Sequence, residues 1–407
     1  MRCHSVSARL DWREQIAARG YDVSLLENPA YWIEASEEPF CAVFSRQELD
    51  DTIDRATRQL TKLALELVEE VCCSGNSEHY FDQLQTPPQF RECIRRSWKR
   101  HDKSLYGRFD FAYSDNSLKL LELNFDTPTS LYESAHLQRM WLEDMRHTGQ
   151  IPFAATQHNS IQEKLIACLR MNFPEHPVFH LGTFEHAREE TENLKYLQSC
   201  ANQGGLQTQF IYLDDVRFEA HGQLVDMQRR PISCLFKLFP WELIFAEDLK
   251  SHRETGNYIF SPLVTSNRTT FVEPAWKSIL SNKGALPLLW DLANDRQFLL
   301  DAKFDNGSDA ANSIKSGAHV RKPLFGREGA GITLTDDLGQ STHTAAANPD
   351  QGQFVVQSYA PLSEYRDFNL VIGSWVIGDE PAGVSVRADR SKITGRNALF
   401  VPHYVVD

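Results

Sequence analysis

Residues 107–130 read GRFDFAYSDNSLKLLELNFDTPTS, and this stretch has the clearest structural pattern in the chain. Charged and aromatic residues alternate in its first part, a polar SDNS segment follows, and a second alternating run comes after it. Two runs of period two on either side of a short polar segment predict a β-hairpin.

The predicted hairpin gathers four polar side chains on one face. With Asn116 at its centre, Asp110 lies opposite Glu122. Arg108 then lies opposite Asn124, and all four side chains project to the same side because side chains alternate along a strand. Two carboxylates directly across a strand pair repel each other, so a cation between them is expected. Carboxylate and amide oxygens suit Mg²⁺, with a surface hairpin of solvated carboxylates as the alternative.

The residues that follow the hairpin are rich in hydroxyl groups. Thr127, Thr129 and Ser130 precede a helix that the sequence predicts from about Ser130 to Met145. Such hydroxyls cap a helix N-terminus. The same geometry presents hydroxyls and backbone N–H groups to an anion such as a substrate carboxylate, so both interpretations stay open.

Upstream of the hairpin, an amphipathic helix is predicted. Ser45, with Glu48 three residues later, is the capping-box pattern. Apolar residues then recur at steps of three and four, at Leu49, Ile53, Ala56, Leu60, Leu63, Leu67 and Val71. This spacing predicts a helix with one buried face.

Downstream of the hairpin, helical and strand-like segments alternate. Residues 150–235 mix short apolar runs with helical stretches, which is typical of an α/β unit. Pro274 is predicted to start a helix in EPAWKSILSNKGALPLLWDL. The last third is predicted to be rich in strands, at HVRKPLF, FVVQSYA, RDFNLVIGSWVIG and PAGVSVRA, with Gly373, Gly378 and Gly383 at turns or bends.

A lysine precedes a glycine-containing loop in the last third of the chain. Lys322 stands on a predicted strand, and Gly326, Gly329 and Gly331 follow it. Such a loop can close its backbone N–H groups over phosphates, with the lysine as a point charge on them. The P-loop pattern G-x-x-x-x-G-K-[ST] occurs nowhere, and a lone lysine before a glycine turn is a weak signal by itself.

Bulk composition limits the classes of function. The 407 residues carry a formal net charge of −13, which argues against a general nucleic-acid binder and is compatible with a cationic substrate such as a polyamine. The eight cysteines are scattered without zinc or redox spacing. Neither an apolar segment of about 18 residues nor a secretory signal occurs, so we expect a cytoplasmic protein without membrane contact.

Six blocks of sequence carry a resemblance to a known family. They are RFDF (108–111), LELNFDTPTSLYES (121–134), FKLFPWELIF (236–245), FVEPAWKSILSNKGALPLLW (271–290), RKPLFGREGAGI (321–332) and GSWVIGDEPAGVSVRAD (373–389). In this order and over nearly the whole chain, they resemble the glutathionylspermidine synthase-type synthetases, in particular the stand-alone bacterial members that lack the amidase domain. The resemblance implies an α/β (α+β) fold, namely a circularly permuted ATP-grasp fold with an associated preATP-grasp-like α/β substrate domain.

The domain organisation that we expect follows from the same resemblance. It comprises a helical or irregular N-terminal segment that packs on the synthetase (1–105), the metal-binding hairpin and helix of the ATP-grasp core (106–149), a preATP-grasp-like α/β domain (150–240), and the nucleotide-binding part with a Gly-loop lid near 321–332 (241–407).

The resemblance also implies roles for individual residues around the reacting phosphate. Asp110, Glu122 and Asn124 fall on the magnesium ligands of the family. Arg108 falls on the arginine that faces the transferred phosphoryl group, and Arg387 on an arginine near the reacting phosphate.

Other matches concern the nucleotide and the substrates. They are Lys283 and Lys322 on the two lysines that bind ATP phosphates, Gln357 where the adenine edge is read, Thr127 and Thr129 on contacts to the acyl substrate, and Glu189 and Glu190 near an acidic pocket for a polyamine. Each match has an ordinary alternative. Lys283 could be an exposed residue just inside a helix, Gln357 a strand residue facing solvent, and Arg387 a surface ion-pair partner.

The chemistry that the resemblance implies is ATP-dependent amide formation. A carboxylate does not accept an amine directly because its oxygen is a poor leaving group, so ATP would convert it to an acyl phosphate, with Mg²⁺, in two ions, neutralising the phosphates. The implied partners are small molecules only, a carboxylate donor and an amine acceptor. The alternatives are a phosphotransferase on the same site and a nucleotide-binding regulatory protein without turnover.

Overall fold

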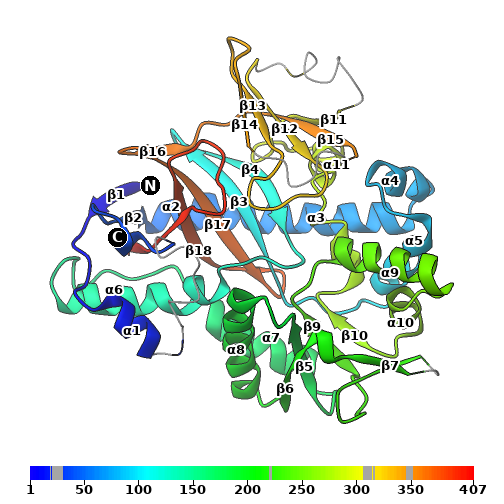
Figure 1. Cartoon of the computed structure of the whole chain (residues 1–407). Helices are drawn as coiled ribbons and strands as arrows, with labels where there is room; N and C mark the ends of the chain where they lie inside the picture. Colours follow the sequence, from blue (N-terminus) through cyan, green and yellow to red (C-terminus); the bar gives the residue numbers. More distant parts are fainter. Residues whose placement is uncertain (19, 21–30, 220–221, 306–313, 315–316, 345–351) are drawn as a thin grey trace.

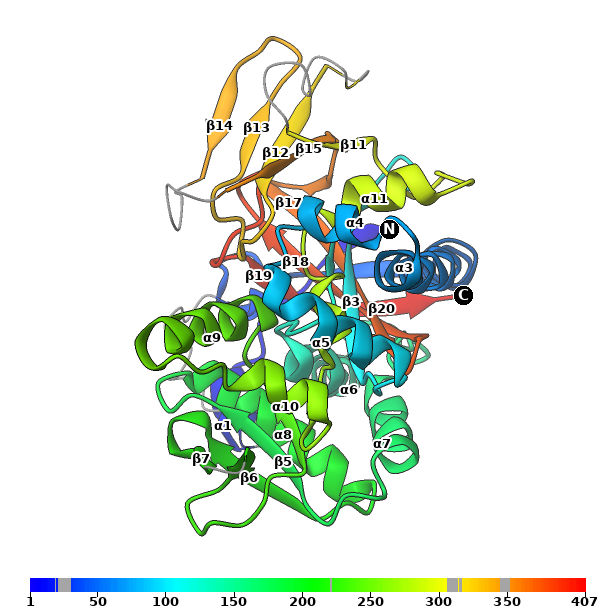
Figure 2. The ribbon, with the colours of Figure 1, turned by 90° about the vertical axis from the view of Figure 1, so that its right-hand side faces the viewer.

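A computed structural model gives the structure of the protein (Figure 1), and it describes residues 1–18, 20, 31–219, 222–305, 314, 317–344 and 352–407. Helices and strands are mixed throughout, so the predicted α/β class is confirmed. Three main sheets follow one another from the top of Figure 1 to the bottom, and Figure 2 shows the same order after a quarter turn. No helix within these ranges is long and apolar enough to cross a membrane.

The middle sheet is antiparallel and joins two distant parts of the chain. Its strand order is β19-β18-β17-β3-β4, and β16 pairs with β17. The strands are β3 (Tyr106–Ser114), β4 (Ser117–Asn124), β16 (Ser363–Tyr365), β17 (Phe368–Ile377), β18 (Glu380–Asp389) and β19 (Leu399–Val401). The predicted hairpin, β3–β4, is therefore completed by strands from the C-terminal end of the chain (Figure 1).

The structure confirms the predicted cross-strand pairs of the hairpin, but the turn and the register between turn and pairs differ from the prediction. Asp110 pairs with Glu122, and Arg108 pairs with Asn124. The turn is the two-residue segment Asp115–Asn116, whose φ angles of 50° and 59° are both positive. Asn and Asp tolerate this conformation, and a two-residue turn of this kind matches the twist of the flanking strands.

A β-bulge in β4 reconciles the turn with these pairs. Phe111 pairs with Leu120 while Asp110 pairs with Glu122, so Leu121 is an extra residue between the two pairs. The simple alternation predicted for β4 is therefore wrong before the bulge, because Leu118 and Leu120 face the core rather than the side of Glu122.

The two faces of the middle sheet have opposite character. Phe109, Phe111 and Leu120 are fully buried in a core that they share with apolar residues of α3 (Arg55–Cys73). Arg108 and Asp110 project to the other face, where they line a cavity. Alternation along β3 thus sends aromatic rings into the core and charges into the cavity.

The helix ahead of the hairpin begins as predicted. Ser45 and Glu48 form the capping box, with each side chain bonded to the backbone N–H of the other. The helix continues through α2 (Arg46–Glu48), the π-helical η3 (Leu49–Asp54) and α3, and α4 (Ser77–Gln83) and α5 (Pro88–Lys99) follow it. The predicted apolar face is buried, except that Leu63 is only half-buried.

The upper sheet carries the segment with the predicted Gly loop. Its order is β11-β15-β12-β13-β14, all antiparallel. The strands are β11 (Ala302–Phe304), β12 (His319–Pro323), β13 (Thr333–Thr335), β14 (Ser341–His343) and β15 (Phe354–Ser358). The loop between β12 and β13 descends toward the middle sheet (Figure 2).

The lower sheet is parallel and has the order β10-β9-β5-β6. Its strands are β5 (Phe179–Thr183), β6 (Thr208–Tyr212), β9 (Cys234–Lys237) and β10 (Thr270–Val272), with a separate pair, β7 (Arg217–Glu219) and β8 (Gln223–Val225). The helices of this part are α7 (Ile161–Asn172), α8 (Arg188–Gln203), α9 (Trp241–Thr255) and α10 (Phe260–Ser266), with the 3₁₀ turn η5 (Leu213–Asp215). Because β10 lies after residue 240, the lower sheet contains strands from both of the expected domains 150–240 and 241–407.

A small sheet and further helices close the left side of Figure 1. The strands, in the order β1-β2-β20, are β1 (Arg2–Ser5), β2 (Phe40–Ser45) and β20 (His403–Val406). Nearby are α1 (Trp12–Ala18), the 3₁₀ turn η2 (Ile33–Ala35), the π-helical η4 (Glu133–Leu137) and α6 (Gln138–His147). The helix predicted to start near Ser130 is confirmed by η4 and α6.

Two local predictions for the second half are wrong. The segment after Pro274 is not one helix but a 3₁₀ turn, η6 (Ala275–Ser278), and a separate helix, α11 (Ala285–Leu292). Lys283 lies in the turn between them, where its backbone N–H donates to the carbonyl of Leu324 at 3.0 Å. Gly373 lies inside β17 rather than at a bend, and an added Cβ would stand 2.8 Å from Cδ of Arg108.

The buried imidazole of His403 gives a pH-dependent stability. Its Nε2 accepts the backbone N–H of His158 at 3.2 Å, and burial lowers the pKa of His403 to about 3. Between that value and the ordinary pKa near 6.5, the unfolded chain binds a proton that the folded chain does not. We therefore expect the free energy of unfolding to fall by about 2 kcal/mol from this group alone between pH 7 and pH 5.

Urea denaturation at the two pH values measures this loss of stability. A His403→Gln variant should show a smaller decrease than the wild type, because glutamine does not titrate. Equal decreases in both proteins would contradict the assignment.

Candidate active site

Four hairpin side chains meet on the cavity side of the middle sheet. Arg108 donates from Nε and Nη2 to the two carboxylate oxygens of Asp110 at 2.6 and 3.0 Å, and from Nη1 to the carbonyl of Thr129 at 2.7 Å. Asn124 Nδ2 donates to Asp110 Oδ2 at 3.0 Å and to Glu122 Oε1 at 3.3 Å. The hairpin therefore brings together the four residues predicted from its pattern.

Two lysines from distant segments reach the same place. Lys283 Nζ lies 3.3 Å from Glu122 Oε2 and donates to the carbonyl of Gly326 at 2.7 Å. Lys322 Nζ donates to the carbonyl of Leu121 at 2.9 Å. The side chain of Lys283 is only 11% exposed and lies in a turn, so the alternative of an exposed helical lysine is wrong.

The charges of this cluster shift one another's pKa values. Burial alone would raise the pKa of Glu122, but the positive charges of Lys283 and Lys322 outweigh it and lower the pKa to about 2. Burial lowers the pKa of Lys322 to about 8 although Glu122 acts in the opposite direction. The carboxylate is thus held ionised next to cations that already have protein partners.

Gln357 lines the cavity but both ends of its amide are occupied. Its Oε1 accepts from Lys322 Nζ at 2.8 Å, and its Nε2 donates to the carbonyl of Leu120 at 3.1 Å. The residue is 2% exposed, so the alternative of a solvent-facing strand residue is wrong. In this arrangement Gln357 positions Lys322, and the contact to adenine stays a prediction.

The Gly loop passes close to another part of the chain, and at one position only glycine fits. Gly326 and Gly329 line the cavity. Gly329 has a φ of 73°, and an added Cβ would stand 2.8 Å from the carbonyl oxygen of Thr394, so no larger residue fits there without movement. Gly331 also has a positive φ, of 71°, but is not among the residues that line the cavity.

One N–H group of the Arg387 guanidinium has no hydrogen-bond partner among the described residues. Its Nη2 donates to the carbonyl of Gly395 at 2.8 Å, while Nε is buried without a hydrogen-bond partner among the described residues. None of the ion pairs found in the described part of the chain involves Arg387, so the alternative of a surface ion pair is not supported. A buried donor without a partner is costly and suggests an anionic ligand that would accept from it.

Two cavities adjoin at this end of the molecule. The main cavity is lined by the hairpin residues, Thr127, Lys322, the Gly loop and Gln357. The acidic cavity is lined by Tyr31, Pro128, Thr129, Ser130, Glu133, Glu189, Glu190, Asn193, Leu238, Glu328, Arg387, Arg396 and Asn397. All the substrate residues predicted from sequence therefore line one of the two cavities.

Ser130 does not act as a simple helix cap. Its backbone has a φ of 69°, and its hydroxyl is hydrogen-bonded to the hydroxyl of Tyr31. Among the described residues, this hydroxyl has no hydrogen bond from a backbone N–H of the helix that begins at Leu131. The interpretation of this hydroxyl as part of a binding site therefore remains, and the capping interpretation is not supported.

Sequence patterns missed several residues that line these cavities. Tyr31 and Glu133 line the acidic cavity, and Lys392 lines the main cavity. Tyr31 is brought there because its carbonyl accepts the N–H of Phe400 at 2.6 Å. No local motif marks any of the three, since their place depends on contacts between distant segments.

Two buried ion pairs fix the strands that carry the site. Asp126, just after β4, pairs with Lys237 at 2.6 Å and accepts the N–H of Trp241 at the start of α9. Glu273 pairs with Lys277 at 2.8 Å and accepts the N–H of Tyr106 at the start of β3. The side chains of both pairs are at most 2% exposed. They join both ends of the hairpin to the lower sheet and its helices.

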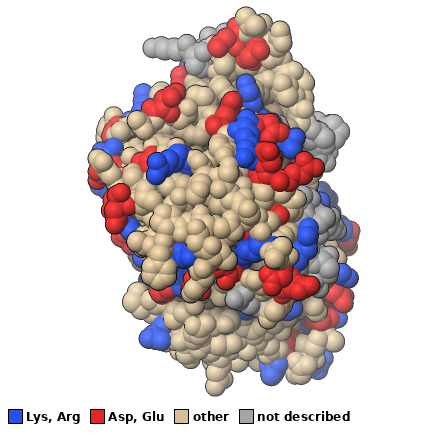
Figure 3. Space-filling view, turned by 90° about the vertical axis from the view of Figure 1, so that its left-hand side faces the viewer, with Lys and Arg blue, Asp and Glu red and all other residues tan. Residues whose placement is uncertain are grey.

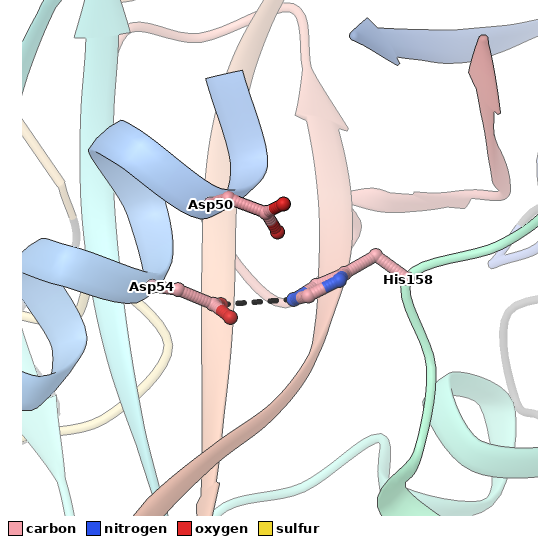
Figure 4. A group of neighbouring side chains, drawn as sticks. All are labelled: Asp50, Asp54 and His158. Carbon is pink, nitrogen blue, oxygen red and sulfur yellow. Dashed lines mark hydrogen bonds and ion pairs between the residues drawn. The ribbon is translucent and has the colours of Figure 1, made fainter. Parts of the chain in front are cut away.

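A separate group of titratable side chains lies away from the cavities. Asp50 and Asp54 on η3 face His158, and their ligand atoms lie within 4.8 Å of one another (Figure 4). Asp54 already has two cationic or donor neighbours, His158 Nε2 at 2.9 Å and Arg58 at 3.6 Å. These contacts account for the carboxylate of Asp54 without a metal ion.

Charges of both signs are mixed on the surface. The face in Figure 3 shows Lys and Arg next to Asp and Glu around a broad uncharged area, with no continuous basic field.

Comparisons with known proteins identify relatives over the whole chain. A family model described as "Glutathionylspermidine synthase preATP-grasp" matches residues 3–406. A protein of Haemophilus influenzae with the provisional name acid–amine ligase is 32% identical over 415 residues, which cover 98% of this chain and 98% of that protein. The bifunctional glutathionylspermidine synthetase/amidase of Escherichia coli is 24% identical over 395 residues. This chain matches 60% of the length of that longer protein, and 91% of the chain takes part in the match.

Among solved structures, a glutathione synthetase-like effector from Globodera pallida in its apo form is similar. The TM-score is 0.56 at 11% sequence identity, and the match covers 98% of this chain and 96% of the effector. At this level of identity the likeness concerns the fold alone. It places the chain with glutathione synthetase-like folds.

Proposed function

Because the chain belongs to the glutathionylspermidine synthase preATP-grasp family, we propose that it is an ATP- and Mg²⁺-dependent ligase that joins a carboxylate to an amine through an acyl phosphate. Relatives of the chain carry the names acid–amine ligase, glutathionylspermidine synthase and glutathionylspermidine synthetase/amidase, so an amide-forming enzyme is the class that membership supports.

The observation that carries the proposal is the charge arrangement of the main cavity. At its wall, Asp110 is paired with Arg108 at 2.6 Å, and Glu122 lies 3.3 Å from Nζ of Lys283, which is just outside the lining of the cavity. The positive charges of Lys283 and Lys322 both lower the pKa of Glu122. Oxygen ligands for a hard divalent cation thus stand next to charges suited to phosphate oxygens. A site for transfer of a phosphoryl group needs both in one place.

The three proposed metal ligands fit Mg²⁺ with one adjustment. Asp110 and Glu122 offer charged oxygens, and both lie beside Asn124. The amide nitrogen of Asn124 faces these carboxylates, and a turn of the amide by half a revolution would offer its oxygen instead. ATP with Mg²⁺ would supply an activated phosphoryl group, and Gly326 and Gly329 would close over it as parts of a lid, with Gly331 at its end.

Ligand binding would exchange the partners of the cations. Arg108 is held by Asp110, and Lys283 by Glu122. Carboxylates that held a metal ion would leave both cations available for phosphate oxygens. Arg387, whose buried Nε has no partner among the described residues, would donate to an anionic group without giving up an ion pair.

The substrates are proposed to occupy the acidic cavity and its border. Thr127, Thr129 and Ser130 would contact the carboxylate donor, and Glu189 and Glu190 the amine. We also propose the permuted order of an ATP-grasp core, with metal ligands early and nucleotide lysines late, and the domain ranges 1–105, 106–149, 150–240 and 241–407.

An assay of ADP release tests the proposed function. ADP formation should require ATP, Mg²⁺, a carboxylate and an amine together, and mass spectrometry should detect the amide. A screen of γ-glutamyl peptides against polyamines and amino acids provides the substrates. A stable phosphorylated product without amide would favour a phosphotransferase, and ATP binding without any turnover would favour a regulatory protein.

A further inference from the structure

The two cavities share only a few of the described residues that line them. Pro128, Thr129, Glu328 and Arg387 line both the main cavity and the acidic cavity. In the proposed reaction, an amine must reach a carboxyl group that is activated next to the phosphates. The border formed by these four residues is the place where the amine and the activated carboxyl group can meet.

Glu328 is the acidic residue at this border. Thr129 offers a backbone carbonyl, which already accepts from Arg108, and Arg387 is a cation. A protonated amine is attracted by a carboxylate and repelled by a guanidinium group. Of the four shared residues, Glu328 is therefore the one whose charge favours a cationic amine.

The backbone of Glu328 supports a positional role. Its φ is 53°, in the left-handed region that costs a residue with a side chain about 1–2 kcal/mol. Gly329, which follows it, is also left-handed, with a φ of 73°. These two residues are the central residues of a turn in which the N–H of Ala330 donates to the carbonyl of Arg327 at 2.9 Å, and this turn brings Glu328 to the border of the cavities.

The ordinary explanation for Glu328 is a surface ion pair, and it is weak. Arg396 Nε lies 4.0 Å from Glu328 Oε2, and the two side chains are 64% and 55% exposed. Exposed pairs of this kind contribute about 0–1 kcal/mol to stability. Such a contact does not account for an acidic residue at a left-handed position between two cavities.

We propose that Glu328 binds an ammonium group of the amine substrate, other than the uncharged amino group that attacks, at the border of the two cavities and so selects amines that carry such a cation. This inference rests on the proposed ligase function and deepens it. Glu328 lies two residues after Gly326, whose carbonyl accepts from Lys283, so the loop that covers the phosphates also carries the amine contact. The amine contact then forms only when the loop is in place over the main cavity.

Kinetics with a charged and an uncharged amine test the inference. The probes are spermidine, which is cationic at neutral pH, and hydroxylamine, which is uncharged there, each with ATP, Mg²⁺ and glutathione. In a Glu328→Gln variant, the KM for spermidine should rise tenfold or more, while hydroxylamine-dependent ADP release and the Kd for ATP should stay within about twofold of the wild type. A Glu328→Asp variant should recover part of the loss.

A matched control comes from a carboxylate of similar exposure on α3. Glu66 is 53% exposed and lies near Lys62, as Glu328 lies near Arg396. A Glu66→Gln variant should leave both amine reactions unchanged. An Arg396→Ala variant should keep the preference for spermidine, because Arg396 competes with the amine for the same carboxylate.

The outcomes separate this inference from the proposed function. If the wild type releases ADP with spermidine and Glu328→Gln leaves its KM unchanged, or lowers both amine reactions equally, the inference is overturned and the ligase function stands. It is also overturned if the wild type uses hydroxylamine but no cationic amine among spermidine, putrescine and lysine. If no pair of carboxylate and amine supports ADP release, the proposed function itself is wrong.

Discussion

A Glu122→Gln variant is expected to lose about 10²–10³-fold in Mg²⁺-dependent ADP release, the scale seen when one charge-stabilising group is removed from an active site. Glutamine keeps the size of the side chain and one oxygen but not the charge. It would bind a divalent cation less well, and it would leave Lys283 and Lys322 facing each other without the carboxylate that balances them.

Two measurements separate a loss of metal binding from general damage. Calorimetry should show weaker binding of ATP in the presence of Mg²⁺, and a thermal melt should show a folded protein. Glu92→Gln, on α5 and 58% exposed, is the matched control and should keep full activity. Wild-type rates in Glu122→Gln would remove Glu122 from the proposed metal site.

The second large effect concerns stability rather than binding. A Lys277→Met variant should lower the free energy of unfolding by about 3–5 kcal/mol, because it leaves the buried charge of Glu273 without its partner. Glu273 is 0% exposed and also accepts the N–H groups of Leu105 and Tyr106, so the loss would reach the start of β3.

The double variant Glu273→Gln, Lys277→Met is the informative comparison. Burial raises the pKa of Glu273 even though Lys277 acts in the opposite direction, which shows that taking this carboxylate out of water is costly. Removing both charges should therefore recover part of the stability lost in Lys277→Met. The urea midpoints of the two variants measure this recovery of stability. A double variant less stable than Lys277→Met would contradict the expected cost of the unpaired charge.

The hairpin shows how far a sequence pattern can specify a site. The pairs of Asp110 with Glu122 and Arg108 with Asn124 were predictable because alternation of side chains is a local rule. The turn and the bulge at Leu121 were not predictable. The two-residue turn shifts the strand register by one residue from the predicted centre, and the bulge shifts it back by one residue, so the same pairs result. The correct pairs were thus predicted from an incorrect internal register.

Other parts of the site depend on contacts that no local pattern encodes. The periodic run after Pro274 predicted one helix, but the chain breaks it where Lys283 turns toward Glu122 and the carbonyl of Leu324 fixes its backbone. Tyr31 lies at the acidic cavity through contacts with distant residues, a backbone bond to Phe400 of β19 and a hydroxyl bond to Ser130. Family resemblance supplied the positions of the cations, and the structure supplied the partners that hold them.

The placement of β3 between β4 and β17 has a consequence for biosynthesis. A ribosome completes β4 long before it reaches β17, and at roughly 5–20 residues per second the delay amounts to about ten seconds or more. Until then the outer edge of β3 has no neighbouring strand, which makes the nascent polypeptide vulnerable to aggregation. Catalytic competence should therefore arise after translation of this region is finished, and chaperone dependence during expression would be its visible sign.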